Sequence, residues 1–423
     1  MKIISDLHIH GRYSRATSKA LDVANLEKWA RVKGVDLLGT GDFTHPTWIE
    51  HLKANLKEDQ ETGILQTKTG FNFILQTEIS LVYTQNDKGR RVHVVVLAPS
   101  LEVVNQITDY LKSKGRIDYD GRPIFKISCI EFTEDLKKIS EDIEIIPAHI
   151  WTPWFALFGS KSGFDTINEA FGDQVKNIHA LETGLSSDPA MNWRLSQLDR
   201  FQLVSFSDLH SFWPWRMARE ATIFDLEKLS YKGIIKALRT GQGLSGTIEV
   251  DPSYGKYHFD GHRNCNIHFS PEEALKHNNI CPVCKRPLTL GVLHRIEELA
   301  DRPEGYKPKN AKPFKRLIPL SEILAGLYKT TMATKKVWSE YNTLLKAFAS
   351  EYDILLNASP DALKKVTDEK IADAILKNRQ GKLKVIPGFD GVYGVPVFNE
   401  ADMPVQKQET EIKKKQKGLN DFF

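Results

Sequence analysis

The sequence predicts an α/β protein: a barrel of parallel strands, followed by a small zinc-binding module and a C-terminal helical domain. Seven apolar, strand-like runs occupy the first 210 residues, and stretches of helical period or turn separate them, as at residues 25–33 and 226–238. Strands that alternate with helices in this way favour a parallel sheet closed into a barrel. A histidine or carboxylate lies at or beside one end of each run. Because barrel enzymes place their chemistry at the carboxyl ends of the strands, we expect these side chains to share one rim.

The first run contains two histidines with the spacing of a chelate. It reads Ser5-Asp6-Leu7-His8-Ile9-His10. Side chains at positions i and i+2 of a strand leave on the same face, so His8 and His10 converge on one point. This spacing predicts that both histidines bind metal.

The other six runs bring further ligand types to the same rim. In chain order they are residues 35–40 with Asp42 and His45, 71–77 with Glu78, 92–98 with His93, 143–148 with His149, 177–181 with Glu182, and 202–207 with Asp208 and His210. Imidazole and carboxylate together suit zinc, manganese or iron, and a ligand count well above four predicts two or three ions. His51 and His179 lack this placement and are interpreted as structural or surface residues.

These residues resemble, in order and spacing, the motifs of the polymerase and histidinol phosphatase (PHP) superfamily of metal-dependent phosphoesterases. The resemblance covers roughly residues 1 to 250 and is carried by His8-Ile9-His10, Glu78, His93, His149 and Asp208-Leu209-His210. It implies a distorted seven-stranded (β/α) PHP barrel that holds two or three Zn²⁺ ions, with Mg²⁺ or Mn²⁺ as further ions that support catalysis.

Two departures from the family pattern affect the ligand set. Members usually carry an aspartate shortly after the first His-x-His, where this chain has Ser14-Arg15-Ala16. The usual Thr-Asp-His is replaced by Thr40-Gly41-Asp42-Phe43-Thr44-His45, so that Asp42, His45 or both serve as ligands.

A segment after the sixth run is similar to one branch of the superfamily, the endonuclease Q family of archaeal and bacterial DNA repair nucleases. It reads Glu182-Thr183-Gly184-Leu185-Ser186-Ser187-Asp188-Pro189. The resemblance implies an endonuclease that nicks DNA 5′ of deaminated bases (uracil, hypoxanthine, xanthine) and of abasic sites. It makes Glu182, Asp188 and Asp42 catalytic candidates. For Asp188, capping a helix over residues 189–198 is the alternative, because Asp before Pro favours a helix start.

A second metal site is predicted from cysteine spacing. The segments are His262-Arg-Asn-Cys265-Asn-Ile-His268 and Cys281-Pro-Val-Cys284. Two ligands that flank one tight turn can face the same tetrahedral ion, so paired x2 spacings predict a structural Zn²⁺. His262 is the preferred fourth ligand, because its spacing mirrors that of Cys281 and Cys284, and His268 is the alternative. Cys129 stands alone and is interpreted as an inert core thiol.

The last third of the chain is predicted to be helical and to end in a disordered tail. Periodicity of 3.6 residues marks residues 321–329, 335–351 and 360–380, and residues 386–395 read as a turn-rich strand pair. The predicted domains are therefore 1–250 (barrel), 251–320 (zinc module and basic connector), 321–398 (helical domain) and 399–423 (tail). The tail ends in Gln416, Leu419, Phe422 and Phe423, a pattern similar to the motif that binds the sliding clamp PCNA.

Composition limits the class of protein. The chain has 423 residues, a net charge of +4 and 41% hydrophobic residues, and it contains no apolar run of 18 residues and no signal-peptide pattern. We therefore expect a cytoplasmic globular protein without a membrane partner. Basic runs at 307–316 and 413–417 favour contact with the DNA backbone, with a solvated linker and tail as the alternative. Aromatic loops at 151–158 and 212–215 favour contact with a damaged base, with core packing as the equal alternative. A small-molecule phosphatase such as a histidinol phosphatase is the alternative function, and a scaffold without activity is a third.

Overall fold

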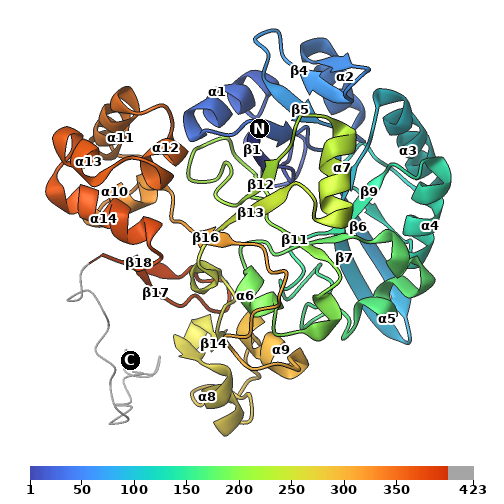
Figure 1. The fold of residues 1–423 in the computed structure, drawn as a ribbon. Coiled ribbons are helices and arrows are strands. Elements are labelled where there is room, and N and C mark those ends of the chain that lie inside the picture. The colour runs from blue at the N-terminus through green and yellow to red at the C-terminus, as the bar shows by residue number, and fades with distance from the viewer. Residues whose placement is uncertain (399–423) are drawn as a thin grey trace, which may run out of the picture.

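The computed structural model describes residues 1–398, so the predicted clamp-binding residues at 416–423 lie outside the described part. In Figure 1 the N-terminal segment (blue to green) forms the central body. The C-terminal helices (orange to red) lie on one side of it, and the predicted zinc module (yellow) lies at one end. Among the described residues, no helix is long and apolar enough to cross a membrane.

The largest sheet contains eight strands in the order β16-β13-β12-β1-β2-β5-β4-β3. In the first part of the sequence, β1, β2 and β5 pair in parallel, as predicted, whereas β1 pairs with β12 in antiparallel fashion. The strands are β1 (Lys2–Asp6), β2 (Leu37–Gly39), β3 (Lys57–Asp59), β4 (Ile64–Gln66), β5 (Asn72–Ile74), β12 (Ala221–Asp225), β13 (Leu244–Glu249) and β16 (Phe314–Arg316).

A long hairpin dominates the second sheet, and here the prediction of parallel strands is wrong. Strands β6 (Gln76–Gln85) and β7 (Lys88–Leu97) pair antiparallel along their whole length. The two residues between them, Asn86 and Asp87, have φ of 53° and 58°, as in a tight two-residue hairpin turn, which the apolar periodicity does not reveal. Glu78 therefore lies inside a strand rather than after one. Strands β8 (Ile124–Phe125) and β9 (Glu144–Pro147) complete this sheet.

The third sheet pairs β10 (Ala180–Glu182) in parallel with β11 (Gln202–Val204). Side chains from all three sheets meet in one buried cluster, which includes Ile3, Leu37, Ile74, Val95, Ile146 and Val204. The strands thus surround a barrel-like interior, but in the described chain their backbone hydrogen bonds do not close the single parallel barrel that the sequence predicts.

Side chains bridge the seams between the sheets. At the seam between β5 and β6, the Gln76 side chain accepts hydrogen bonds from the backbone N–H groups of Ile9 and Gly41 at 3.3 and 3.0 Å. At the seam between β11 and β12, the hydroxyl of Thr222 exchanges two 3.0 Å hydrogen bonds with the backbone of Ser205. Side-chain groups therefore satisfy backbone polar groups that a continuous ladder would have paired.

Helices cover the outside of the sheets (Figure 1). Most of the longer ones begin at a Ser or Asp whose side chain accepts a hydrogen bond from the first turn, as Asp22 does for α1 and Ser230 for α7. They are α1 (Val23–Lys33), α2 (Pro46–Asn55), α3 (Leu101–Lys114), α4 (Cys129–Ile139), α5 (Ile167–Phe171), α6 (Pro189–Asn192) and α7 (Tyr231–Thr240).

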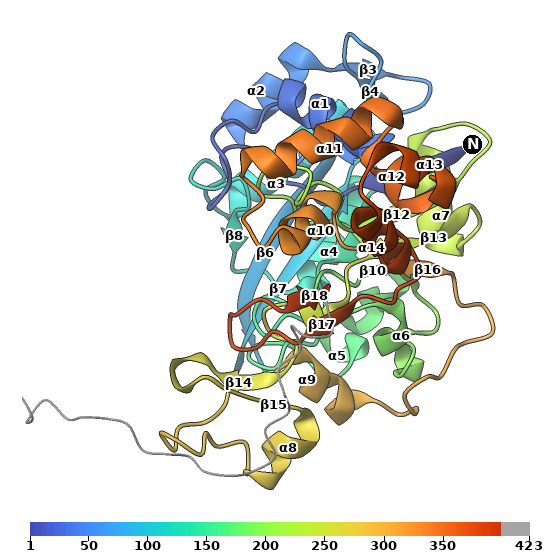
Figure 2. The same ribbon diagram turned by 90° about the vertical axis from the view of Figure 1, so that its left-hand side faces the viewer.

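The C-terminal half contains two smaller units. The first includes β14 (Asp260–His262), β15 (Ile267–Phe269), α8 (Pro271–Lys276) and α9 (Val292–Leu299). The second contains α10 (Leu320–Leu327), α11 (Lys335–Ala347), α12 (Glu351–Leu356), α13 (Pro360–Val366) and α14 (Glu369–Arg379), followed by the paired strands β17 (Lys384–Ile386) and β18 (Val395–Val397). In Figure 2 the helices of the second unit lie in the upper part of the view, and the first unit lies at the lower end of the molecule. The domain limits at 250, 320 and 398 stay predictions.

Two of the predicted helices are each split in two. The stretch 335–351 ends at Ala347, and Ser350 caps the new helix α12. The stretch 360–380 is interrupted at Thr367, which is extended, and Asp368 caps α14. Ser and Asp compete for backbone N–H groups and so start new helices inside an otherwise continuous apolar periodicity.

Candidate metal centre

Four side chains at one end of the barrel-like interior form the first ligand group. Ligand atoms of His8, His10, Glu78 and Asp208 all lie within 4.8 Å of one another. Nε2 of His10 lies 3.1 Å from a carboxylate oxygen of Glu78 and 3.1 Å from one of Asp208. Nε2 of His8 is buried and has no hydrogen-bond partner in the described protein. An unpartnered imidazole nitrogen facing carboxylates fits a metal ion.

A second ligand group shares Glu78 with the first. It consists of Glu78, His93 and His149, again with ligand atoms within 4.8 Å. Oε1 of Glu78 lies 2.8 Å from Nδ1 of His93 and 3.3 Å from Nε2 of His149, while Oε2 faces His8 and His10. The hairpin register explains the arrangement, because His93 lies opposite Ser80 and is therefore a diagonal neighbour of Glu78 on the same face. Glu78 thus belongs to both ligand groups.

The carboxylates and histidines of the two groups shift one another's ionisation. Burial opposes the charged form of His8, His10 and His149, but the neighbouring carboxylates outweigh it and raise the pKa of all three. Burial opposes ionisation of Glu78, but the attraction of His93 and Arg122 outweighs it and holds the pKa of Glu78 well below its usual range. Burial likewise opposes ionisation of Asp208, yet its pKa lies well below the usual value because of His210 and His10. Burial lowers the pKa of His93 to about 4. Ionised carboxylates and neutral imidazole are the forms that bind metal, so metal binding would displace protons from His8, His10 and His149.

Two carboxylates orient the histidines of the first group from behind. Nδ1 of His8 lies 2.9 and 3.0 Å from the two oxygens of Glu182, and Nδ1 of His10 lies 2.9 Å from Oδ1 of Asp42. The hydroxyl of Ser14 donates to the other oxygen of Asp42 at 2.8 Å. Ser14 thus stands near where family members carry an aspartate, and it fixes Asp42 against His10. Carboxylates in this position set the tautomer and direction of a ligating imidazole.

Three other predicted residues lie outside the two groups. His210 is adjacent, with its ring centroid 4.7 Å from that of His10. His45 lies at the start of α2, where its ring stacks on Tyr13 at 4.5 Å. Asp188 caps α6 by accepting from the N–H of Met191, and its other oxygen accepts from Nε of Arg316 at 2.7 Å. The structure therefore does not bring His45 or Asp188 to the ligand atoms.

Arg122 is a member of the site that the sequence does not predict. Its Nη1 donates to Oε2 of Glu78 at 3.0 Å. The turn that carries it fits closely, since a Cβ atom on Gly121 would lie 2.3 Å from a carboxylate oxygen of Asp42. No motif or periodicity marks this loop, so only the fold reveals that a guanidinium adjoins the ligands.

A cavity of about 650 Å³ opens beside the two ligand groups. Aromatic side chains form part of its wall: Trp154 packs edge-on against Tyr257 at 5.5 Å, and Phe155 packs against His93 at 4.7 Å. Its other lining residues include His149, Glu182, Asp208, His210, Arg216, Arg219, Lys256 and Tyr393. The predicted aromatic loop at 151–158 therefore reaches the cavity. By contrast, Trp213 and Trp215 stack on one another and contact Trp338 of the helical domain.

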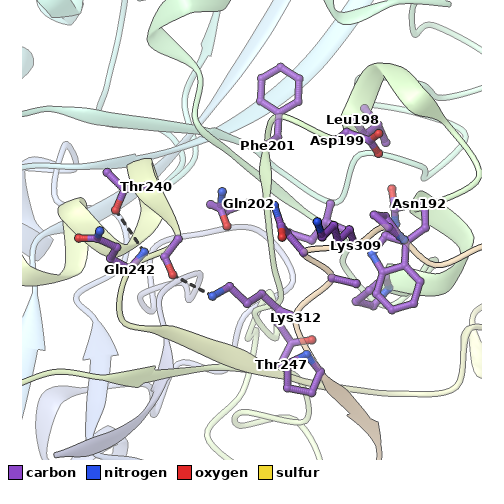
Figure 3. Close-up of a pocket in the computed structure, with 18 residues that line it drawn as sticks. Asn192, Leu198, Asp199, Phe201, Gln202, Thr240, Gln242, Thr247, Lys309 and Lys312 are labelled. Carbon is purple, nitrogen blue, oxygen red and sulfur yellow. Dashed lines mark hydrogen bonds between the residues drawn. The ribbon is translucent and has the colours of Figure 1, made fainter.

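A separate cavity of about 570 Å³ lies beneath the basic connector (Figure 3). Lys309 and Lys312 of the connector line this cavity. Nζ of Lys312 donates a hydrogen bond to the carbonyl of Gly241 at 2.9 Å. The lining contains none of the predicted metal ligands. We therefore place the candidate chemistry at the first cavity.

The predicted cysteine site is assembled in the structure. Ligand atoms of His262, Cys265, Cys281 and Cys284 lie within 4.8 Å of one another, with Sγ of Cys284 3.4 Å from Nδ1 of His262. The alternative ligand His268 instead stacks on Phe389 at 4.7 Å. One turn provides His262 and Cys265, and the other provides Cys281 and Cys284. One imidazole and three thiols form the donor set of a tetrahedral zinc site.

Comparisons with known proteins support one family. Residues 319–382 match the family model described as the MJ0043 C-terminal domain. An uncharacterized protein of Methanocaldococcus jannaschii is 32% identical over 267 residues, which make up 62% of this chain but 33% of that protein, so the match spans about a third of that relative's length. The uncharacterized protein YqxK of Bacillus subtilis is 29% identical over 413 residues, which cover 93% of this chain and 98% of that protein.

Two solved structures are similar over nearly the whole chain. The lesion-specific endonuclease PfuEndoQ from Pyrococcus furiosus has 32% identity and a TM-score of 0.85, covering 96% of this chain and 98% of that one. A complex of endonuclease Q with a 27-mer duplex substrate that has an abasic lesion at the active site gives the same identity and TM-score, covering 97% and 100%. Similarity of this extent shows that the chain belongs to the endonuclease Q family.

Proposed function

We propose that this chain is a metal-dependent DNA endonuclease that nicks the backbone 5′ of damaged bases, namely the deaminated bases uracil, hypoxanthine and xanthine, and of abasic sites. The observation that carries the proposal is the pair of ligand groups that share Glu78 beside a cavity of about 650 Å³. Membership of the endonuclease Q family supports it. The small-molecule phosphatase predicted as an alternative would leave the similarity over 96% of the chain unexplained.

The proposed ions are Zn²⁺ in both ligand groups, with Mg²⁺ or Mn²⁺ supporting catalysis. His8, His10, Glu78 and Asp208 would hold one ion, and Glu78, His93 and His149 the other. Such ions, when bound, supply Lewis acidity that neutralises phosphate and activates water. The unpartnered Nε2 of His8 and the mixed donor set fit this assignment.

The remaining residues of the site orient ligands and carry protons. Glu182 and Asp42 hold His8 and His10 with Nε2 toward the shared carboxylate. Nδ1 of His210 donates to the backbone carbonyl of Asp208 at 2.8 Å, so Nε2 is the ring atom left to bind metal or accept a proton. We assign Asp188 a positioning role: with Arg316 it holds the connector strand β16 against α6.

The cavity beside the ligands is proposed to receive the damaged nucleotide. A nuclease that selects a lesion has to take the nucleotide out of the base stack into a pocket. The half-exposed ring of Trp154 and the ring of Tyr257 offer faces and edges on which a base can pack. His93, His149 and Asp208 of the ligand groups line the same cavity, so a scissile phosphate would lie beside the proposed ions.

Two further assignments complete the proposal. The His262, Cys265, Cys281 and Cys284 cluster would hold a structural Zn²⁺. The C-terminal residues Gln416, Leu419, Phe422 and Phe423 are proposed to bind a PCNA-type sliding clamp, an assignment that rests on the sequence alone.

Nicking of end-labelled duplexes tests the proposed function. Substrates contain uracil, hypoxanthine, an abasic site or no lesion at one defined position. We expect wild-type protein with Zn²⁺, Mg²⁺ or Mn²⁺ to cut on the 5′ side of each lesion and to leave the undamaged duplex intact. Glu78→Gln should lose activity and bound metal together, whereas Glu50→Gln, an exposed change on α2, should keep both. Equal cutting of damaged and undamaged duplex, or full activity of Glu78→Gln, would contradict the proposal.

A further inference from the structure

Two arginines on the cavity wall form no ion pair within 4 Å among the described residues, although the buried carboxylates of Glu220 and Glu322 lie near enough to interact with Arg219 electrostatically. Arg216 and Arg219 both line the cavity beside the ligand groups. Other arginines near the site pair with carboxylates, as Arg122 does with Glu78 and Arg316 with Asp188. Because Nε and Nη1 of Arg219 are shielded from water and lack hydrogen-bond partners, this guanidinium is costly in the ligand-free cavity. The excess of unpaired hydrogen-bond donors on this wall indicates that the cavity binds a ligand with hydrogen-bond acceptor atoms.

Tyr393 and Lys256 extend this wall. The Tyr393 ring lies 4.6 Å from Nζ of Lys256 and 5.8 Å from Cζ of Arg216. Burial opposes ionisation of the Tyr393 phenol, but Arg219, Arg216 and Lys256 outweigh it and lower its pKa. Arg216, Arg219 and Lys256 therefore lie around the Tyr393 phenol on one side of the cavity. Each of these three side chains is positively charged and can only donate hydrogen bonds.

The donor-only character of the wall matches the chemistry of deamination. Deamination replaces the exocyclic amino group of cytosine, adenine or guanine by a carbonyl oxygen, which changes a hydrogen-bond donor into an acceptor. A guanidinium can donate to that oxygen, but opposite an amino group it would bring two donors together. Such a site discriminates uracil from cytosine and hypoxanthine from adenine, because the amino-bearing parent base leaves the buried donors unpaired.

We propose that Arg216 and Arg219 are specificity-determining residues that read the carbonyl oxygen created by deamination in a base held in the cavity. This inference rests on the proposed function. Both residues lie on the segment between β11 and β12 that also provides Asp208 and His210. Recognition and metal binding are therefore built on one stretch of chain.

A phosphate oxygen of the DNA backbone is also an acceptor, and the test separates the two sources. The variants are Arg216→Met and Arg219→Met, with Arg219→Lys as a milder change and Arg31→Met as a control that removes an exposed guanidinium on α1. Single-turnover nicking rates are measured on duplexes that differ only in carrying uracil, hypoxanthine or a tetrahydrofuran abasic analogue. The abasic duplex has no base to read but keeps every phosphate.

We expect each cavity variant to slow nicking at uracil and hypoxanthine about tenfold or more relative to nicking at the abasic analogue, as loss of a hydrogen bond to a charged donor predicts. Arg31→Met should leave this ratio at the wild-type value. The ratio is independent of how much protein is folded, because both rates come from the same preparation. If the ratio of the rate at uracil or hypoxanthine to the rate at the abasic analogue does not change, the inference is wrong. If, in addition, the nicking rate falls equally on all substrates, the two arginines bind backbone phosphate instead. If wild-type protein nicks none of the substrates, the proposed function fails instead.

Discussion

Lys33 of α1 and Glu351 of α12 form a buried ion pair that joins the helical domain to the barrel segment. Nζ of Lys33 lies 2.7 Å from Oε1 of Glu351, and the two side chains are 1% and 0% exposed. Nζ also donates to the carbonyl of Pro214 at 2.8 Å, in the segment that connects the metal ligands to the cavity arginines. We predict that Lys33→Met strongly destabilises the protein, because it leaves the carboxylate of Glu351 buried without a counter-ion.

The contacts of Glu351 set the size of the effect. Removing one partner of a buried pair typically costs about 3–5 kcal/mol. After Lys33→Met, Glu351 would still accept from the backbone N–H of Leu320 at 3.1 Å and the hydroxyl of Tyr341 at 2.7 Å, which favours the lower end. The unpaired carbonyl of Pro214 adds a further cost of about 1 kcal/mol or more. We therefore expect a loss of about 4 kcal/mol in the free energy of unfolding.

Urea unfolding of four proteins measures this coupling. They are wild type, Lys33→Met, Glu351→Gln, and the double variant, which carries no buried charge at this position. The double variant should be more stable than Lys33→Met, because Gln keeps an acceptor for Leu320. Lys228→Met, which breaks the exposed pair with Glu61, is the matched control and should cost less than about 1 kcal/mol. A cost below about 1 kcal/mol for Lys33→Met, or a double variant no better than the single one, would refute the reasoning.

The cysteine site, the buried carboxylate of Glu249 and the tail each allow a further test. Cys281→Ser should lower bound zinc by about one ion per chain and lower the melting temperature, and metal analysis showing no difference would remove the structural-zinc assignment. Burial raises the pKa of Glu249 from 4.5 to about 8, so its contribution to stability is complete below pH 4.5 and is lost as the pH rises through about 8. Glu249→Gln should therefore flatten the fall in melting temperature between pH 5 and 8.5, and a slope equal to that of wild type would contradict this. Removal of residues 416–423 should abolish binding to the sliding clamp without slowing nicking of short duplexes. In a peptide of residues 413–423, Phe422→Ala and Phe423→Ala should each cost about 2 kcal/mol of binding by calorimetry.

The convergence of the metal ligands could be predicted because it depends on local pattern. Strand parity places His8 and His10 on one face, and the other ligands lie beside apolar runs that pack around one interior. Their division into two groups could not be predicted, because it depends on the pairing of β6 with β7. That register follows from the turn at Asn86 and Asp87, whose conformation no apolar periodicity encodes.

Partners from distant parts of the chain could not be predicted either. Arg122 reaches Glu78 from a loop 44 positions later in the sequence, and Arg316 reaches Asp188 across 128 positions. Arg122 belongs to no motif, and an arginine in a loop usually indicates only a solvated surface. Arg316 ends the basic run 307–316, a pattern that does not predict a carboxylate partner. The sequence therefore indicated ligand types more fully than it indicated the groups that hold or neutralise them.

The segment between β11 and β12 joins the candidate metal ligands and the proposed recognition residues to the helical domain. It carries Asp208 and His210 at one end and Arg216 and Arg219 at the other. Lys33, held by Glu351 of α12, fixes the carbonyl of Pro214, and the hydroxyl of Tyr352 donates to the carbonyl of Ala218. These contacts fix the segment between its metal-ligand candidates and its arginines, and two of them depend on Glu351 and Tyr352 of α12. Changes in the packing of α12 should consequently alter lesion preference and metal affinity together, although no residue of that helix lines the cavity.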